Sequence, residues 1–220
     1  MNKILLDNII CENNIINLEK QVKNITVGGQ TLINIFNIDI TSLNILVEDN
    51  SSLVVNYFNN IKNMEAKINI KVQNNSKCVF NHSFINKELY NLEINTDFMN
   101  DYSNIKVNVH GINDRGTSNI IENGYVKENK YNNNLDECIK IMNINEGKSL
   151  SMPNMFIDSF DVSANHNNTV SNIDPNELFY FLSKGISLES AKKLICNGFL
   201  GSIISDRELK TRIIEYLNRR

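Results

Sequence analysis

The stretch AKINIKVQ (Ala66–Gln73) decides the fold, because its apolar side chains alternate with polar ones. In an extended chain, successive side chains point to opposite faces, so Ile68 and Ile70 share one face and the lysines and asparagine share the other. A helix would need apolar residues three or four positions apart. The stretch therefore predicts a β-strand with one face in a core and the other in solvent.

Strands of this kind recur along most of the chain. Eight are clear: Thr31–Ile40, Leu43–Glu48, Ser52–Phe58, Ala66–Gln73, Lys77–Ile85, Tyr90–Phe98, Asn104–Ile112 and Ser118–Val126. In the seventh, Val107 and Val109 are the expected inward residues. A spacing of about ten to fifteen residues is typical of all-β folds, and with few glycines and two prolines it suits a sandwich, a barrel or a β-solenoid. No strict repeat chooses among the three.

Composition indicates one folded domain with a small appendage. The chain has 220 residues and a net charge of -3, and about a fifth of it is asparagine, interspersed with Ile, Leu and Val. Asparagine tolerates the left-handed backbone of tight corners. The basic residues are scattered, so we expect no nucleic-acid partner. No apolar segment approaches the roughly 18 residues of a membrane span, and we expect a cytoplasmic protein without a membrane partner.

The last 50 residues carry helix signals. Asp174 precedes a proline and opens one helix, which stops at Gly185. Ser187 can begin a second helix that ends near Gly198, and Ser205–Glu208 has the spacing of a capping box that opens a third. Three short helices are predicted to form a compact cap on the β-rich part.

The cysteines and two histidines give little sign of a site by themselves. The four cysteines are far apart, with no C-x-x-C pair, so neither a zinc ribbon nor a cluster cradle is encoded: Cys11, Cys78, Cys138 and Cys196. In a reducing compartment we expect free thiols, with Cys196 buried in its helix. Cys78 is a weak candidate for a sulphur acceptor if it faces outward. His82 and His110 lie in strands, and we expect them on a solvated face.

The C-terminal part, DVSANHNNTVSNIDPNELFYFLSKGISLESAKKLICNGF (Asp161–Phe199), resembles the signature of the SufB/SufD family of iron-sulphur cluster assembly proteins. A histidine precedes a small-x-Ile element, LFY, a Ser-Lys-Gly-Ile turn, a helical alanine and a closing Gly-Phe: His166, Ser171, Ile173, Leu178, Phe179, Tyr180, Ser183, Lys184, Gly185, Ile186, Ala191, Gly198 and Phe199. Lys184 stands where the family usually has arginine. Asn167 replaces the glutamate that follows the histidine in SufB-type members, which favours SufD.

The resemblance implies a fold: a mainly β protein with a right-handed β-helix (β-solenoid) core and a small C-terminal α-helical cap. It favours the solenoid among the three architectures. We place the β-helix core at residues 1–166 and the helical region at residues 167–220. The chain is shorter than familiar SufD proteins, and the difference falls in the N-terminal helical region and the early rungs.

The resemblance also implies where chemistry takes place. The sequence places His166 just past the last predicted strand, and in the family this histidine lies at the SufB/SufD interface. Cys138 precedes Pro153 as the interface cysteine of SufB-type members precedes a proline. Imidazole and thiolate both bind iron, so Cys138 and His166 are candidate transient metal ligands, expected within about one side-chain length of each other. The alternatives are a loop histidine without a role and a cysteine that serves as a small hydrophobe.

The function implied is that of a SufD-like subunit of a SufBCD-type scaffold in the SUF system, not an enzyme by itself, which responds to the ABC-type ATPase SufC. The partner-binding candidates are Phe179, Tyr180, Lys184 and Gly185 on the first helix. The chain has no G-x-x-x-x-G-K-[ST] motif, so nucleotide would bind the partner. No cofactor is expected to stay bound, although an iron-sulphur cluster or iron would pass through at a subunit interface.

Three alternatives remain open. A minimal SufB-like scaffold acting as a homodimer, in place of pairing with a SufB-like paralogue, fits Cys138, which is a SufB feature. A purely structural binding module would be favoured if His166 and Cys138 were buried and far apart. A β-helix carbohydrate-active enzyme would need acids clustered on one face of the solenoid. Asp97, Asp101 and Asp114 fall at strand ends or in turns without a regular spacing.

Overall fold

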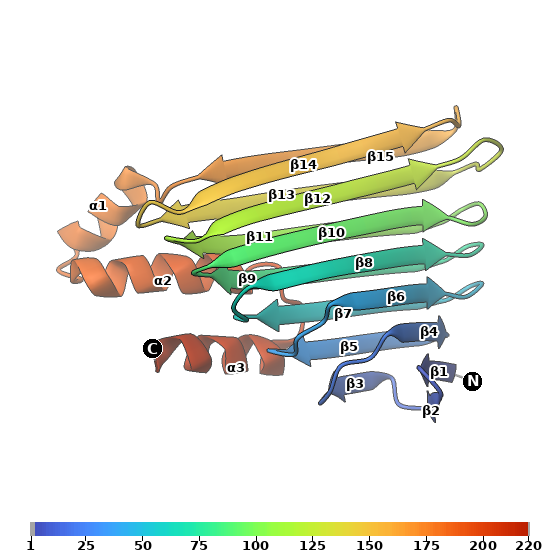
Figure 1. The fold of residues 1–220 in the computed structure, drawn as a ribbon, viewed down its shortest axis with the longest axis horizontal. Coiled ribbons are helices and arrows are strands. Elements are labelled where there is room, and N and C mark those ends of the chain that lie inside the picture. The colour runs from blue at the N-terminus through green and yellow to red at the C-terminus, as the bar shows by residue number, and fades with distance from the viewer. Residues whose placement is uncertain (1–2, 220) are drawn as a thin grey trace.

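The protein is a β-solenoid of two parallel sheets with three helices alongside, as a computed structural model describes it for residues 3–219 (Figure 1). Sheet A contains, in spatial order, β14 (Lys148–Ile157), β12 (Thr117–Val126), β10 (Leu89–Phe98), β8 (Met64–Val72), β6 (Ser42–Val47), β4 (Asn24–Gly28), β1 (Lys3–Leu6) and β2 (Ile9–Cys11). Sheet B contains β15 (Val162–Ser171), β13 (Asn133–Ile144), β11 (Asn104–Asp114), β9 (Lys77–Asn86), β7 (Ser52–Asn59), β5 (Gln30–Phe36) and β3 (Ile15–Leu18). The helices are α1 (Pro175–Ser183), α2 (Leu188–Gly201) and α3 (Arg207–Asn218). The β-solenoid prediction is confirmed.

From β3 onward the chain alternates between the sheets, so each pair of strands makes one turn of the solenoid. Strand pairs are parallel except for those of β1, which pairs antiparallel with β2 and β4. The turns lengthen along the chain: Asn17 stacks on Asn34, 17 residues away, whereas Lys106 stacks on Asp136, 30 residues away. A solenoid whose turns grow has no constant period, which explains why the sequence shows no strict repeat.

Alternate residues of every strand fill the space between the sheets. The four residues predicted to face inward, Ile68, Ile70, Val107 and Val109, are all 0 % exposed. Each is stacked between like residues of neighbouring turns, for example Ile68 between Leu43 and Ile94. Burial of one such side chain is worth about 1.5–3 kcal/mol, so these columns supply most of the stability of the solenoid.

Asparagine turns the corners between strands. Seven asparagines adopt the left-handed backbone conformation, with φ between 48° and 58°: Asn37, Asn50, Asn63, Asn75, Asn129, Asn132 and Asn145. Most other residue types disfavour this region, because their Cβ approaches the following carbonyl oxygen, and here only four of them among residues 3–219 adopt it: Asp7, Tyr102, Arg115 and Glu146. The expected use of asparagine at the corners is thereby confirmed.

Asparagine also forms ladders along the outer faces of both sheets. On sheet A the side-chain amides of successive turns are hydrogen-bonded at 2.9–3.1 Å, through Asn24, Asn44, Asn69, Asn95, Asn123 and Asn154. A second ladder on sheet B, at 2.8–3.2 Å, joins Asn17, Asn34, Asn56, Asn81 and Asn108. In each pair Nδ2 of the later residue donates to Oδ1 of the earlier one. The amide group spans the spacing of about 4.8 Å between strands, so the ladders reinforce the backbone pairing.

The three predicted helices are present, and they cover the solenoid along the side of sheet B. Helices α2 and α3 cover an apolar patch on the outer face of that sheet, which contains Phe36, Phe58, Ile112 and Met142. Phe58 and Ile112 are buried in one cluster with Leu200 and Ile213. The chain therefore folds back from β15 toward β5, and the last turn of the solenoid stays open.

The helix signals are largely confirmed. Asp174 and Ser187 cap α1 and α2 by accepting hydrogen bonds from backbone N–H groups, at 2.9 and 3.2 Å, and Gly185 follows α1 with a φ of +79°. The cap of α3 is Asp206 rather than the serine before it. Helix α2 continues past Gly198, because the residues that follow still pack into the cluster on sheet B.

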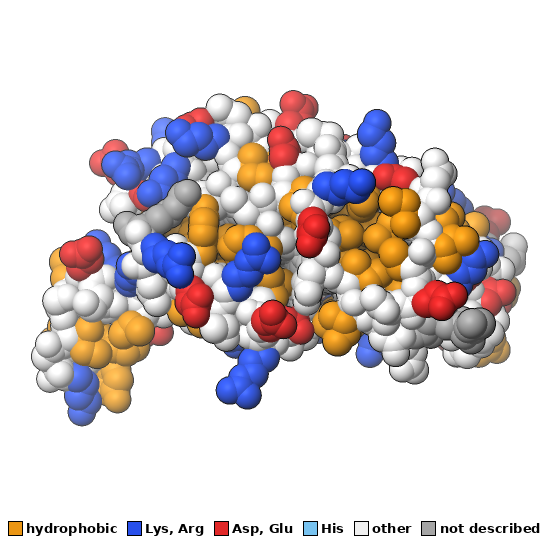
Figure 2. All heavy atoms as spheres, turned by 90° about the horizontal axis from the view of Figure 1, so that it is seen from below, with side chains coloured by type: hydrophobic (Ala, Val, Ile, Leu, Met, Phe, Trp, Pro, Cys, Tyr) orange, Lys and Arg blue, Asp and Glu red, His pale blue; other side chains and the backbone are white. Residues whose placement is uncertain are grey.

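The surface carries no extended patch of one charge on the face seen from the N-terminal end, where acidic and basic side chains are interspersed (Figure 2). Apolar side chains are also exposed at that end, including Ile9, Ile10 and Ile15. Within the part of the chain that the structure describes, every helix is too short or too polar to cross a membrane.

Candidate functional site

The last turn of the solenoid, made by β14 and β15, is an open end. These strands terminate sheets A and B, and no strand among residues 3–219 pairs with their outer edges. Large apolar side chains are exposed on or beside them: Leu150, Met152, Phe156, Ile157, Phe160 and Val170. An exposed edge with unpaired backbone groups and apolar side chains is a surface for another chain.

His166 lies within β15, and the expectation that it sits just past the last strand was wrong. It pairs in register with Glu137 of β13. Val162 and Ala164, which are in phase with it, pack against the main core, so His166 projects from the inward side of an incomplete turn. The ring is exposed and makes no hydrogen bond to residues 3–219. The polar sequence around it concealed the strand.

Cys138 lies on β13, between Asn108 of β11 and Asn167 of β15. It occupies the position that follows Asn108 in the ladder of sheet B, so a thiol stands where the ladder would have another amide. The side chain is half-buried on the outer face, in a strand whose alternate residues Glu137 and Ile139 face inward. Burial raises the pKa of the Cys138 thiol, and the neighbouring Lys140 opposes that shift.

Cys138 and His166 are brought to adjacent strands, but their side chains do not meet. They are one residue out of register, since Cys138 pairs with Asn167 and His166 with Glu137. The pleat directs them to opposite faces of sheet B. Within residues 3–219, no group of three or more His, Cys, Asp or Glu side chains is arranged to hold a metal ion. The expected side-by-side presentation within one chain is therefore corrected.

Two buried carboxyl groups lie inside the solenoid next to the open turn. Glu122 of β12 and Glu137 of β13 are 0 % and 1 % exposed, and their oxygens have no hydrogen-bond partner among the described residues. Burial raises the pKa of Glu137 to about 7, and burial together with Glu137 raises the pKa of Glu122. A neutral carboxyl avoids the large cost of an unpaired buried charge. Sequence reasoning missed this pair, although both glutamates fall in the inward phase of their strands.

Two further cysteines, Cys78 and Cys196, and the other two histidines are wholly or partly buried. Cys78 faces the core, where burial raises the pKa of its thiol to about 12, so it is not an outward sulphur acceptor. Cys196 is half-buried, and burial raises its pKa to about 11. His82 and His110 do not decorate a solvated face. His82 lies inside the solenoid, 2.6 Å from the Tyr90 hydroxyl, and His110 stacks on Phe199 of α2.

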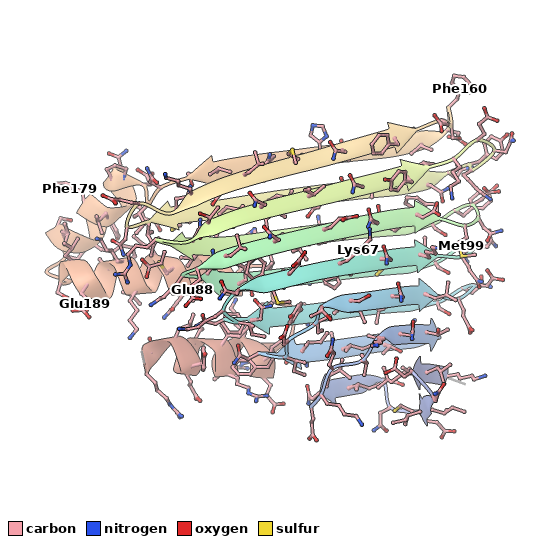
Figure 3. All side chains as sticks on the ribbon, in the orientation of Figure 1. Lys67, Glu88, Met99, Phe160, Phe179 and Glu189 are labelled. Carbon is pink, nitrogen blue, oxygen red and sulfur yellow. The ribbon has the colours of Figure 1, made fainter. Side chains whose placement is uncertain are left out.

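Helix α1 presents an aromatic surface to solvent. It has no fully buried residue, and it is anchored through Leu178 and Phe181. On its other side Phe179 is 71 % and Tyr180 59 % exposed. The Nζ atom of Lys184 lies 5.5 Å from the centre of the Tyr180 ring. Figure 3 places Phe179 on this helix and Phe160 at the opposite end of the last turn.

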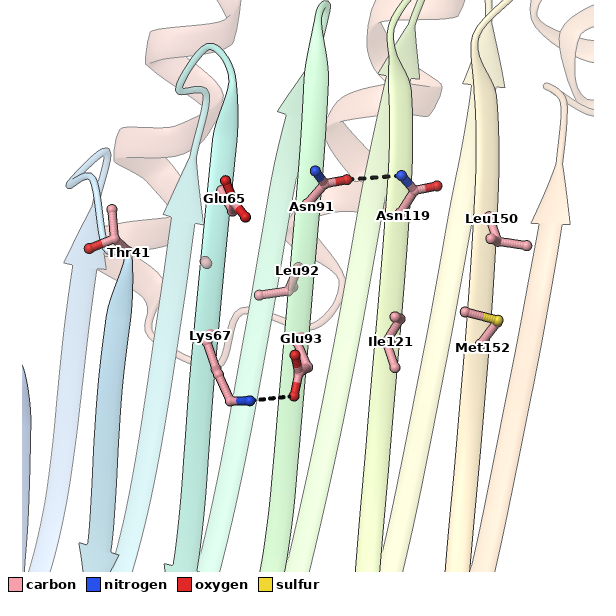
Figure 4. A pocket seen from close by; sticks show the side chains of 11 residues that line it. Thr41, Glu65, Lys67, Asn91, Leu92, Glu93, Asn119, Ile121, Leu150 and Met152 are labelled. Atoms are coloured by element: carbon pink, nitrogen blue, oxygen red, sulfur yellow. Dashed lines mark hydrogen bonds and ion pairs between the residues drawn. The ribbon is translucent and has the colours of Figure 1, made fainter.

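A shallow groove of about 780 Å³ crosses the outer face of sheet A (Figure 4). Its apolar side is formed by Ile121, Leu150 and Met152. On the other side Lys67 is paired with Glu93 at 2.7 Å, and this hydrogen bond lowers the pKa of the carboxyl.

The acids considered for glycoside hydrolysis are also engaged. Asp97 pairs with Lys127 at 2.8 Å, and Asp101 accepts a hydrogen bond from the Tyr131 backbone at 2.9 Å. Asp114 is paired with Lys87 and with the adjacent arginine. A glycosidase needs one carboxyl as a general acid and a second as a base or nucleophile. These acids serve turns and surface ion pairs, which removes the support for that alternative.

Comparison with known proteins points to one family. Residues 126–199, which include β14, β15, Cys138 and His166, match the model described as "SUF system FeS cluster assembly, SufBD core domain". The chain is 26% identical over 116 residues to the iron-sulfur cluster assembly protein SufD of Bacillus subtilis (strain 168), in an alignment that covers 50% of the chain and 26% of that protein.

Two further relatives are an iron-sulfur cluster assembly SufBD family protein of Mycobacterium leprae and SufD of Plasmodium falciparum. The first is 41% identical over 56 residues, covering 25% of the chain and 14% of the relative. The second is 30% identical over 97 residues, covering 42% and 7%. The alignments thus span about a quarter or less of each of these three relatives.

Proposed function

Since the chain belongs to the SufB/SufD family of iron-sulphur cluster assembly proteins, we propose that it is a SufD-like subunit of a scaffold on which clusters are built. The observation that carries this proposal is the open last turn, where the matched segment presents His166 next to two unpaired strand edges. A second subunit, SufB-like, would pair with these edges and cover the exposed apolar side chains. His166 would then lie at the interface.

In this complex the role of His166 is to bind iron in transit or to carry a proton. Its ring is exposed and free of hydrogen bonds to residues 3–219, so both nitrogens are available. Iron and sulphide are the cargo of the reaction. The opposite orientation of Cys138 favours a thiolate supplied by the partner subunit, because one metal ion cannot contact both side chains of a single copy in this arrangement.

The subunit catalyses no reaction alone and responds to an ABC-type ATPase of the SufC kind. The chain lacks a P-loop motif, so the nucleotide belongs to that partner. The docking surface is α1, where Phe179 and Tyr180 are exposed while Leu178 and Phe181 hold the helix in place. Lys184 and Gly185 complete this surface at the end of the helix. Aromatic side chains that are exposed in the free protein and become buried against a partner supply much of the binding energy of protein interfaces.

A minimal SufB-like homodimer is the second candidate. One observation favours it: Cys138 interrupts the asparagine ladder on the half-buried outer face, next to the open turn. In a homodimer, Cys138 of one copy would need to approach His166 of the other.

The test is co-expression with the ATPase and a SufB-like paralogue, followed by native mass measurement and cluster reconstitution. A complex that contains one copy each of this chain and the paralogue supports the SufD-like function, and a dimer of this chain with the ATPase supports the homodimer. Failure to form either complex, with the chain folded, overturns both.

A further inference from the structure

Gly198, in the last turn of α2, is a glycine that packing within the chain does not explain. A Cβ atom built at this position meets no other atom within 4 Å. Its backbone is helical, since the glycines with positive φ are Gly29 and Gly185. Glycine is the poorest helix former after proline. By contrast, a Cβ on Gly201 in the same helix would lie 3.1 Å from the Lys210 side chain, so close packing within the chain accounts for that glycine.

The space over Gly198 belongs to a groove of about 540 Å³ between α2 and α3, which its lining residues define: Ser190, Lys193, Leu194, Asn197, Gly198, Lys210, Ile214 and Asn218. The floor is apolar, with Leu194 49 % exposed and Ile214 half-buried. The residues of α2 in this groove fall three or four positions apart, so they form one straight face of the helix. A glycine in this face allows another backbone to approach closely.

The charge of the groove is positive on a chain whose net charge is -3. Its charged lining residues are Lys193 on α2 and Lys210 on α3, one on each side, and none of the residues 3–219 that line it carries a carboxylate. Lys193 donates to the Asn218 carbonyl at 2.9 Å, and neither lysine forms an ion pair with a residue of the described chain. Acidic side chains on a ligand would therefore find partners on both sides.

We propose that the groove between α2 and α3 binds an amphipathic helix of a partner protein, with an apolar stripe flanked by Asp and Glu. The apolar stripe would lie over Leu194, Ile214 and the flat surface at Gly198, in the manner of helix-in-groove recognition. Helices pack about 8–10 Å apart, and the absence of a side chain favours the short end of this range. This surface is separate from the aromatic side of α1, and the proposal is independent of the ATPase.

The probe is a fluorescein-labelled synthetic helix of about 18 residues, long enough to be partly helical in water. It carries Leu at i, i+3, i+4 and i+7 with Glu on both flanks, and a matched peptide has Lys in place of every Glu. Fluorescence anisotropy with the full chain should show the Glu peptide binding about tenfold or more tightly than the Lys peptide.

Gly198→Leu is the decisive variant, because a Cβ atom at this position meets no other atom within 4 Å and a leucine would occupy the groove. It should weaken binding of the Glu peptide at least about tenfold. The double variant Lys193→Glu/Lys210→Glu should weaken the Glu peptide and strengthen the Lys peptide, and it remains informative if Gly198→Leu fails to fold. Leu188→Ser, an exposed leucine of α2 that does not line the groove, is the matched control and should leave binding unchanged.

Three results would overturn the proposal. The first is no binding of the Glu peptide at about 1 mM, the weakest range of specific association. The second is equal binding of the Glu and Lys peptides, which would mean apolar adhesion only. The third is a concentration-dependent dimer in sedimentation that Gly198→Leu dissociates, since the occupant would then be a second copy of this chain.

Discussion

Cys138 and His166 lie on neighbouring parallel strands, one residue out of register, and their side chains leave sheet B on opposite faces. Neighbouring strands of sheet B therefore present a thiol on the outer surface and an imidazole at the open end of the solenoid. The two groups are poised for contacts with different neighbours, and substitutions at the two sites should have separable effects.

The first prediction follows from this separation. His166→Ala should lower cluster formation in a complex reconstituted with the ATPase and a SufB-like paralogue by about tenfold or more, because no other side chain of β15 binds iron well. Cys138→Ser should leave the yield largely unchanged if the paralogue supplies the thiolate. Absorbance of the cluster is the measurement, and Asn165→Ala, an exposed neighbour on β15, is the control. A normal yield from His166→Ala would leave the open turn as a docking surface only.

The second prediction concerns the asparagine ladders. Asn81 is buried and bonded on both sides, to Asn56 at 3.0 Å and to Asn108 at 2.8 Å. Asn81→Ala leaves Nδ2 of Asn108 without its acceptor and removes one donor from Oδ1 of Asn56, which still accepts from Ser205. It should lower the free energy of unfolding by about 2 kcal/mol. Asn154→Ala, at the end of the ladder on sheet A, breaks one part-buried bond and should lower it by less than about 1 kcal/mol. Equal effects in urea unfolding would contradict a stabilising role for the buried ladder.

The eight strands identified from the sequence have a strong period of two, but β13, which also alternates, was not among them, and β15 lacks the period. Ile68 and Val107 sit in clean alternations and were placed correctly. Strand β15 contains a run of polar residues around His166, because its turn of the solenoid is not enclosed, so periodicity gave no signal there. The N-terminal hairpin of β1 and β2 is too short to show a period.

The burial of His82 and His110 was missed for a different reason. His82 points inward together with the apolar residues of β9. A polar imidazole can be buried there because the hydroxyl of Tyr90, on sheet A, forms a hydrogen bond with its ring. His110 faces outward from sheet B and is buried by α2, which packs there from far along the chain. Contacts between distant segments of this kind leave no local pattern in the sequence.

The third prediction is a loss of stability at acidic pH that depends on His82. Burial lowers the pKa of His82 to about 3, below the value of about 6.5 in an unfolded chain. The unfolded state therefore takes up the proton first, so the contribution of this group is fully present above pH 6.5 and declines as the pH falls toward 3.

The size of this effect is at most roughly 5 kcal/mol, because the pKa of His82 differs by about 3.5 between the two states and each pKa unit corresponds to about 1.4 kcal/mol. His82→Gln should flatten the dependence of the unfolding free energy on pH between about 6.5 and 4, even if the variant is less stable at neutral pH. His110→Gln, whose pKa is also lowered by burial, is the comparison within the same chain. A wild-type profile that is flat in this range would contradict the neutral, buried state of His82.

The last prediction tests docking of the ATPase on α1. Truncation after Asp174 would remove the whole helical region, but it would also uncover Phe58 and Ile112 on sheet B, so loss of binding by that fragment would not separate docking from misfolding. A double substitution, Phe179→Ala/Tyr180→Ala, removes the exposed aromatics and leaves the anchoring side of α1 intact. It should weaken association with the ATPase by about 2 kcal/mol or more, which is about thirtyfold, because aromatic anchors dominate such interfaces. Calorimetric titration is the measurement, Leu194→Ala in the groove between α2 and α3 is the matched control, and undiminished binding by the double variant would exclude α1 as the docking surface.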